Sequence, residues 1–185
     1  MKKQKIEITQ GCILKKVNQD YCVSTDNLAV VLDGCGSGEH SEIGAQRMGE
    51  AIRKNSKEIT SGRKLLRTIV KVFRDIFREG VNAKEFRDKY LFTLLVCIEK
   101  DENFEVHNAG DGYIITIDNN KNVKYIKINN NIMVEGGNAP RYIAYDFIGG
   151  GMYKECAFLD IRFFPKSDYQ SVYVATDGLR FILSD

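Results

Sequence analysis

The stretch LAVVLDGCGSG, residues 28–38, decides how the rest of the chain is interpreted. Its apolar first half predicts a buried strand, which ends in Asp33 and Gly34 and is followed by a loop of glycines and small residues. An acid at the end of a strand can hold a metal ion, whereas a glycine-rich loop can lie against a nucleotide-like cofactor. The positions of the other acids and glycines in the chain decide between a metal site and a cofactor site.

The apolar pattern around this stretch predicts strands on both sides of two long helices. Helical spacing covers residues 40–59 and, more regularly, residues 65–77, with Gly80 as the stop. Strand-like runs precede these helices and resume after a short polar segment, over residues 92–128 and 154–176. This order favours an α+β fold with helices layered against antiparallel sheets.

A region rich in glycine and asparagine, residues 129–151, interrupts the later strands. We expect it to form a loop or flap that contains short strands and shapes access to a site. The last residues, LRFILSD, begin like a helix.

Composition predicts a single globular domain spanning residues 1–185. The chain is 43% hydrophobic and contains two prolines, and we find no linker-like segment and no internal repeat. Its formal net charge of +2 gives no reason to expect nucleic acid or a membrane surface as a partner. The oligomeric state cannot be read from the sequence.

The N-terminus and the cysteines favour a cytoplasmic location. MKKQKIEITQ has no apolar run after its lysines, so we expect no signal peptide. The longest apolar runs fall far short of the roughly 20 residues that span a bilayer. The five cysteines are dispersed, without a Cys-x-x-Cys pair, which is typical of buried thiols in a reducing compartment.

The Asp-Gly pair of the opening stretch occurs twice more after strand-like runs, at Asp111 and at Asp177. If these ends meet in space, their carboxylates repel one another, and hard divalent cations such as Mg²⁺ or Mn²⁺ relieve the repulsion. Asp20 is a fourth acid, just before a further strand. The alternative is three ordinary turns, because Asp-Gly is also a common turn pair.

Four segments, in their order along the chain, resemble the motifs of the metal-dependent serine/threonine phosphatases of the 2C type (PP2C-like). The segments are VNQDY at 17–21, VLDGCGSGEHSEIGA at 31–45, FTLLVCIEKDENFEVHNAGDGYII at 92–115 and VYVATDGL at 172–179. The resemblance implies two antiparallel β-sheets packed as a sandwich and flanked by helices, in α-β-β-α layers. It also implies hydrolysis of phosphoserine or phosphothreonine, in a phosphorylated protein or a small phosphate ester.

The same resemblance implies two, and possibly three, Mn²⁺ or Mg²⁺ ions and assigns their ligands. Asp33 would bridge two ions, and Gly34 would offer its carbonyl oxygen. Asp177 would bind the first ion, and Asp111 would help to hold a third. In the catalytic roles, Asp20 would orient metal-bound water. A hydroxide that bridges the two ions held by Asp33 would attack phosphorus. Lys15 would contact the phosphate.

The chain departs from the family pattern at several positions. Lys15 stands where the family usually has an arginine, and a lysine cannot form the bidentate fork. Cys35 stands where some members have a histidine, and Gly112 and Tyr113 replace the usual serine and arginine. The family's last metal-binding aspartate follows Asp177 by some tens of residues, whereas this sequence ends eight residues after it. We therefore expect a domain that lacks the last metal-binding segment.

Two other interpretations remain open. A phosphatase-like domain without catalysis could bind and regulate a partner, which the departures favour and the four retained acids oppose. The stretch at 31–38 also resembles the loop of S-adenosylmethionine methyltransferases, but two helices in succession do not fit that fold. A cysteine phosphatase needs an arginine six residues after Cys35, where Ser41 stands, and the dinucleotide fingerprint fails at Glu39.

Overall fold

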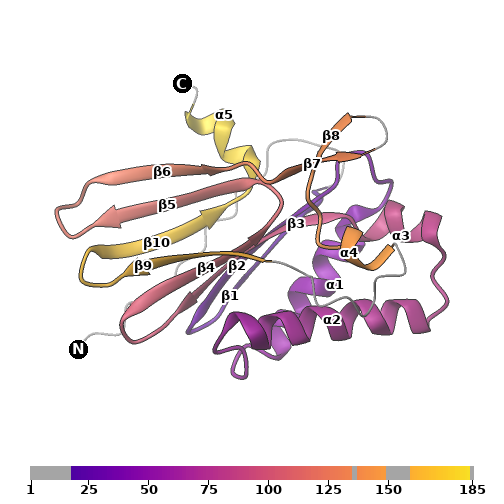
Figure 1. Cartoon of the computed structure of the whole chain (residues 1–185), viewed down its shortest axis with the longest axis horizontal. Coiled ribbons are helices and arrows are strands. Elements are labelled where there is room, and N and C mark those ends of the chain that lie inside the picture. Colours follow the sequence, from indigo (N-terminus) through magenta and orange to yellow (C-terminus); the bar gives the residue numbers. More distant parts are fainter. Residues whose placement is uncertain (1–17, 135–136, 149–158, 184–185) are drawn as a thin grey trace.

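The computed structural model describes residues 18–134, 137–148 and 159–183. Within these ranges, two antiparallel sheets pack face to face, and the longer helices lie against the larger sheet (Figure 1). The larger sheet has five strands, in the order β1 (Asp20–Ser24), β2 (Leu28–Gly34), β3 (Phe92–Glu99), β4 (Asn103–Ala109) and β9 (Asp160–Pro165). The smaller sheet has three, in the order β10 (Tyr169–Ala175), β5 (Gly112–Asp118) and β6 (Val123–Ile128).

The helices and the remaining strands complete the described part of the chain. The helices are α1 (Ser41–Lys54), α2 (Gly62–Arg78), α3 (Ala83–Tyr90), α4 (Tyr145–Ile148), the 3₁₀ turn η1 (Asp177–Leu179) and α5 (Arg180–Leu183). A separate two-stranded ribbon consists of β7 (Asn131–Val134) and β8 (Gly137–Pro140). The α+β sandwich predicted from the sequence is therefore confirmed. None of the described helices has the length and apolar composition of a transmembrane span.

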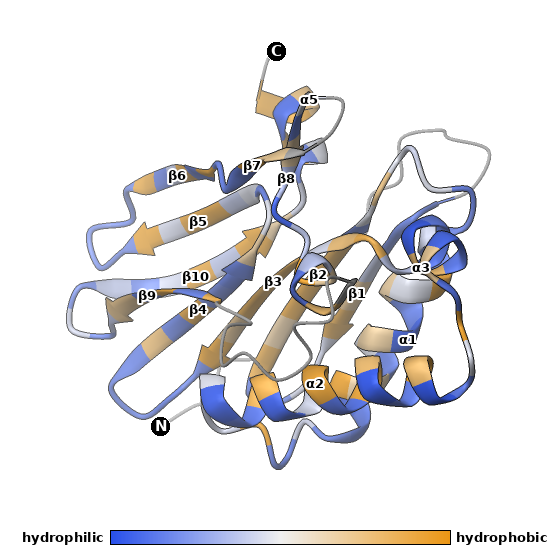
Figure 2. Ribbon diagram, turned by 45° about the vertical axis from the view of Figure 1, so that its right-hand side comes forward, coloured by the Kyte–Doolittle hydropathy of each residue, from blue (hydrophilic) through white to orange (hydrophobic). Residues whose placement is uncertain are grey.

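Strand β3 separates two apolar cores, because its side chains alternate between the two faces of the larger sheet. Leu94 and Val96 face the helices, whereas Leu95 and Cys97 face the smaller sheet. Seven of the eight residues of β3 are buried, which explains its nearly continuous apolar sequence. Figure 2 shows the apolar strands β2 and β3 at the centre of the larger sheet.

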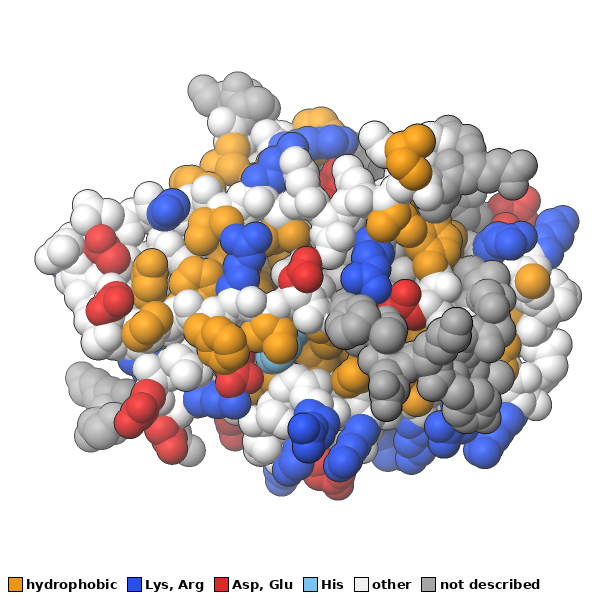
Figure 3. All heavy atoms as spheres, viewed as in Figure 1, with side chains coloured by type: hydrophobic (Ala, Val, Ile, Leu, Met, Phe, Trp, Pro, Cys, Tyr) orange, Lys and Arg blue, Asp and Glu red, His pale blue; other side chains and the backbone are white. Residues whose placement is uncertain are grey.

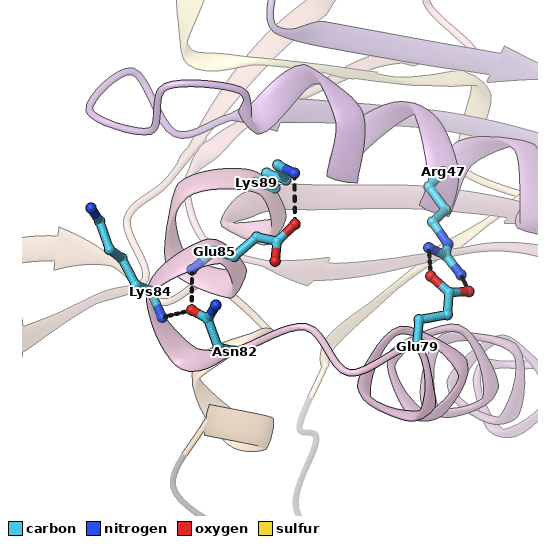
Figure 4. Close-up of polar contacts among 6 residues, drawn as sticks. All are labelled: Arg47, Glu79, Asn82, Lys84, Glu85 and Lys89. Carbon is cyan, nitrogen blue, oxygen red and sulfur yellow. Dashed lines mark hydrogen bonds and ion pairs between the residues drawn. The ribbon is translucent and has the colours of Figure 1, made fainter.

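The helix-side core depends on α2, whose apolar stripe was recognisable in the sequence. Leu65, Ile69 and Phe73 are fully buried on one face of this helix. Ser61 caps the N-terminus of the helix, since its hydroxyl accepts a hydrogen bond from the backbone N–H of Lys64 at 3.5 Å. Ion pairing between Arg47 of α1 and Glu79, the residue after α2, holds the two helices side by side (Figure 4).

Helix α3 was not predicted from its polar sequence. The Asn82 side chain accepts hydrogen bonds from the backbone N–H groups of Lys84 and Glu85, each at 3.0 Å, and so begins the helix (Figure 4). Phe86 and Tyr90 are its buried residues. Their rings lie 5.4 Å apart and join an aromatic cluster with α2, so tertiary packing rather than local periodicity stabilises α3.

The glycine loop after Asp33 serves helix packing. A Cβ atom at Gly38 would lie 2.7 Å from the carbonyl oxygen of Asp88 in α3, so this close approach requires glycine. The buried hydroxyl of Ser41, the first residue of α1, donates a hydrogen bond to the carbonyl oxygen of Cys35 at 2.9 Å. The loop therefore joins β2 to α1 and α3.

Candidate active site

Register in the larger sheet places three polar side chains in one row. Asp20 on β1 lies opposite Asp33 on β2, and Asp33 lies opposite Thr93 on β3. Residues Leu28, Val30 and Leu32 of β2 face the helices, so the alternating residue Asp33 faces the smaller sheet. Asp33 lies within β2, one residue before its end, and is paired on both sides.

The third carboxylate comes from the other sheet. Strand β10 packs over β2 and β3, and the chain then turns through Thr176 into η1, which begins at Asp177. The carboxyl of Asp33 is within hydrogen-bonding contact of the carboxyls of both Asp20 and Asp177. Three acids from β1, β2 and η1, far apart in sequence, thus meet where the two sheets face each other.

This convergence changes the acidity of Asp33. Burial is the largest cause, and the negative charges of Asp20 and Asp177 add to it, together raising the pKa of Asp33 to about 8. Without a cation beside it, the Asp33 carboxyl therefore holds its proton near neutral pH and can donate it to a neighbouring carboxylate.

Asp111 lies beside this cluster, in the turn between β4 and β5. Burial raises its pKa, and the charge of Asp177 raises it further, whereas the positive charges of Lys127 and Arg180 oppose the rise. Arg180 also forms an ion pair with Asp177, with Nη1 and Oδ2 3.4 Å apart. Asp177 thus links Asp111 to Asp33. The positively charged side chains of Lys127 and Arg180 lie near Asp111, beside the acidic cluster.

Gly34 meets a strict steric requirement. A Cβ atom at this position would lie 2.6 Å from the hydroxyl oxygen of Ser41 and 2.8 Å from the carbonyl oxygen of Gln19. Its backbone N–H donates a hydrogen bond to that same carbonyl at 3.2 Å. Only glycine fits here, and its backbone lies directly beside the acids.

The donor set fits hard divalent cations. Carboxylate and carbonyl oxygens are the ligands that Mg²⁺ and Mn²⁺ prefer, and a cation relieves the repulsion that raises the pKa of Asp33. In the described ranges, no group of three or more His, Cys, Asp or Glu side chains is placed so that it could hold a metal ion. Asp33 interacts with both Asp20 and Asp177, and the charge of Asp177 also acts on Asp111.

Cys35 connects the candidate site to the glycine- and asparagine-rich region. Cys35 is buried, and its thiol hydrogen-bonds with the hydroxyls of Ser37 and Tyr142. Tyr142 precedes α4, whose Phe147 ring lies tilted against Phe73 of α2, with ring centroids 4.5 Å apart. The region expected to be a flap is therefore anchored in the helix-side core, next to the loop that follows Asp33.

Gly112 explains one departure from the family pattern. Its φ angle of +143° lies in the range that favours glycine. A Cβ atom there would also lie 2.7 Å from the carbonyl oxygen of Ala175 and 3.0 Å from Leu95. A serine does not fit at this position, because β5 and β10 approach each other too closely.

Lys15, the expected phosphate contact, lies outside the described residues, as do Cys12 and Cys156. The described cysteines, Cys22, Cys35 and Cys97, are free thiols. His40 is exposed, whereas His107 is 2% exposed and contacts Glu105 rather than the acidic cluster.

Three side chains near the acids were not identified from the sequence: Lys127, Tyr142 and Arg180. Arg180 follows Asp177 by three residues, a spacing that brings side chains together on a helical turn. For Lys127 and Tyr142 the sequence carries no local signal, because strand pairing and the anchoring of α4 bring them to the site.

The fold and its acidic meeting point define a phosphatase-like β-sandwich. The family model described as protein phosphatase 2C matches residues 14–185, and the chain belongs to this family. No curated protein matches the chain.

Solved bacterial phosphatases have the same fold. A bacterial serine phosphatase is 13% identical over 89% of this chain and 74% of its own, with a TM-score of 0.56. Serine/threonine phosphatase Stp1 from Staphylococcus aureus is 13% identical over 95% and 81% of the two chains, with a TM-score of 0.55. The catalytic domain of PstP in complex with two manganese ions is 15% identical over 90% and 74%, with a TM-score of 0.53. At these identities the likeness shows the fold alone.

Proposed function

We propose that the protein is a Mn²⁺- or Mg²⁺-dependent phosphatase that hydrolyses phosphoserine or phosphothreonine. The observation that carries this proposal is the contact of Asp33 with both Asp20 and Asp177, from three separate elements. The family supports the reaction type, and the manganese-bound PstP structure supports the choice of metal.

Each acid has a distinct task in this proposal. Asp33, Asp111 and Asp177, together with the carbonyl oxygen of Gly34, would hold the cations. When bound, divalent cations supply positive charge for the phosphoryl oxygens and lower the pKa of water. Asp20 lies opposite Asp33 and orients water beside it, so no protein side chain needs to act as the nucleophile.

The positive side chains at the rim account for phosphate recognition. Lys127 and Arg180 act electrostatically on Asp111, at the edge of the acidic cluster. Lys15, by the family resemblance, is a third candidate for the phosphate contact. We propose a phosphorylated protein or small phosphate ester as the substrate, the cytoplasm as the location, and no role for nucleic acid or membrane binding.

Hydrolysis of p-nitrophenyl phosphate in the presence of Mn²⁺ tests the proposal. Asp33→Asn should lower turnover by at least about 10²-fold, the usual effect of losing one charge-stabilising group at a reaction centre. Asp26, an exposed acid in the turn between β1 and β2, provides the matched control, and Asp26→Asn should leave turnover unchanged. Equal rates for wild type and Asp33→Asn would remove the enzyme assignment. Phosphoserine and phosphothreonine peptides then test the substrate class.

A second candidate is a non-catalytic domain of the same family that binds or regulates a partner. The ion pair between Arg180 and Asp177 favours it, because a protein cation then occupies one carboxylate oxygen. This candidate predicts no turnover with any phosphate ester, and no change in that result for Arg180→Gln. A rise in Mn²⁺-dependent turnover in Arg180→Gln favours the enzyme instead.

A further inference from the structure

Between the two sheets, directly inside the acidic row, lie two polar side chains with unused hydrogen-bonding groups. Asn108 on β4 is 0% exposed, and neither its amide nitrogen nor its amide oxygen has a partner among the described residues. Thr93 on β3 is 3% exposed, and its hydroxyl likewise has no partner within the described ranges. Buried polar groups in native proteins are nearly always satisfied by protein or by ordered water.

Alternation along the strands places both side chains on the same face as Asp33. Phe104 and Val106 of β4 belong to the core between the sheets, so Asn108, two residues further on, faces the same way. Leu95 of β3 also belongs to that core, so Thr93 faces it too. Both polar groups therefore point into the sandwich rather than toward the helices.

Strand register brings these groups next to each other and next to the acidic row. Thr93 lies opposite Asp33, and Asn108 lies opposite Leu95, which makes Thr93 and Asn108 diagonal neighbours. Diagonal Cβ atoms on one face are within about 7–8 Å of each other, a separation that a single bridging water can span. Asp33, Thr93 and Asn108 thus form a polar line running inward from the acids.

No described side chain competes for Asn108. Its neighbour on the other side is Asp160 of β9, and that carboxylate accepts a hydrogen bond from the Asn130 side chain at 2.7 Å. Gly110, the residue after β4, leaves room above Thr93, since a Cβ atom there would lie 2.7 Å from the threonine methyl carbon. Among the described residues, the amide of Asn108 and the hydroxyl of Thr93 therefore have no hydrogen-bond partner.

We propose that Asn108 and Thr93 hold a buried water between the sheets, and that this water positions the Asp33 carboxyl. One atom of the Asn108 amide, the Thr93 hydroxyl and the Asp33 carboxyl provide three hydrogen-bonding groups, which is the usual number for a buried water. Asn108 and Thr93 are then positioning residues, since they act on the cations only through Asp33. The positioning role rests on the proposed metal-dependent function, whereas the water site does not.

A crystal structure of the metal-free protein, at a resolution that shows ordered water, tests the site itself. We expect one water within hydrogen-bonding distance of the Asn108 amide and the Thr93 hydroxyl. Direct protein partners for both side chains, or a side chain from residues 1–17 or 149–158 in that space, would overturn the proposal.

Calorimetric titration with Mn²⁺ tests the positioning role. Thr93→Val and Asn108→Leu, which keep the shape and remove the polar groups, should each weaken Mn²⁺ binding about 10-fold, as losses of outer-shell partners do. Thr93→Ser should retain wild-type affinity. Thr116→Val is the matched control, because Thr116 is similarly buried, at 1% exposure, on β5 in the facing sheet. The Mn²⁺ affinity of this variant should equal that of the wild type.

Urea denaturation of the same variants separates positioning from simple packing. We expect Thr93→Val to unfold at the same urea concentration as wild type without metal, while its Mn²⁺ affinity falls. Lower stability with unchanged Mn²⁺ affinity would contradict the positioning role, and Thr93→Val gives this answer even if Asn108→Leu does not fold. If wild type binds no Mn²⁺, the proposed function and the positioning role both fall, and the crystal structure still decides the water site.

Discussion

Asp20 lies directly opposite Asp33 across the antiparallel pair of β1 and β2, and both carboxylates face the smaller sheet. Like charges directly opposite each other destabilise a strand pair, and Asp177 brings a third carboxyl to the same place. We expect this arrangement to lower the stability of the metal-free protein, and cations bound as in the proposed function to compensate for the loss. Exposed apolar residues of the described surface include Ile161 and Phe163 on β9 and Tyr173 on β10. Figure 3 shows hydrophobic side chains exposed on this face of the molecule.

Asp33→Asn should stabilise the metal-free protein at alkaline pH. The folded protein holds the Asp33 proton up to about pH 8, whereas the unfolded chain releases it near the ordinary value of 3.8, so wild-type stability falls as pH rises between these values. Asparagine removes this dependence. We expect a gain of at least about 1.4 kcal/mol at pH 8, the equivalent of one pKa unit, from urea denaturation. Asp26→Asn should show no gain, and an Asp33→Asn variant less stable than wild type at pH 8 would contradict the prediction.

Manganese binding should release a proton and strengthen with pH. Because the pKa of Asp33 is raised to about 8, its carboxyl is protonated at pH 7 and has to lose the proton when it becomes a ligand. Calorimetry in two buffers of different ionisation enthalpy should show release of close to one proton at pH 7 and less above pH 9. Asp177→Asn should abolish binding, whereas Asp168→Asn, in the turn between β9 and β10, should not. Tight binding that is independent of pH and of Asp177 would place the ions elsewhere.

Gly112→Ser should destabilise the protein, although serine is usual in the family. The substitution combines a backbone φ angle of +143° with contacts of 2.7 Å to a carbonyl oxygen and 3.0 Å to Leu95. We expect a loss of about 1–3 kcal/mol in urea denaturation. Gly137→Ser is the matched control, because its φ angle is +126° and nothing lies within 4 Å of its Cβ position, so it isolates backbone strain. Equal losses for the two variants would show that the close approach of β5 and β10 contributes nothing.

His107 should make the protein less stable in mild acid. Burial lowers the pKa of His107, an effect that the Glu105 carboxylate partly offsets, so the unfolded chain takes up the proton first as pH falls. Stability contributed by the neutral ring is complete above pH about 6.5 and is lost below it. The loss of unfolding free energy between pH 7.5 and pH 5.5 should be smaller in His107→Asn by up to about 1 kcal/mol. Parallel pH profiles for the two proteins would refute this assignment.

The sequence predicts those elements whose burial leaves a regular apolar pattern in the chain. β3 is buried on both faces and α2 has a regular apolar stripe, so both could be recognised without tertiary information. Helix α3 could not be recognised, because its two buried residues, Phe86 and Tyr90, are held by an aromatic cluster that forms only in the fold. Helix α4 is similarly stabilised by Phe147 packing on α2.

The meeting of the acids was only partly predictable. Three Asp-Gly pairs suggested convergence at one sheet edge, whereas the acids come from two sheets, with Asp33 paired inside β2 and Asp177 in a 3₁₀ turn. Neighbouring cations such as Lys127 depend on strand register, which no local pattern specifies. No local sequence pattern distinguishes Asn108 and Thr93 from other polar strand residues, because their burial depends on the packing of the two sheets.

The most direct test of the central claim is an anomalous-difference map from crystals of this protein grown with Mn²⁺. We predict at least one strong peak within coordination distance of both the Asp33 and Asp177 carboxylates, and no such peak in Asp33→Asn crystals. Peaks confined to other parts of the surface, with these two carboxylates bound only to protein groups, would contradict it.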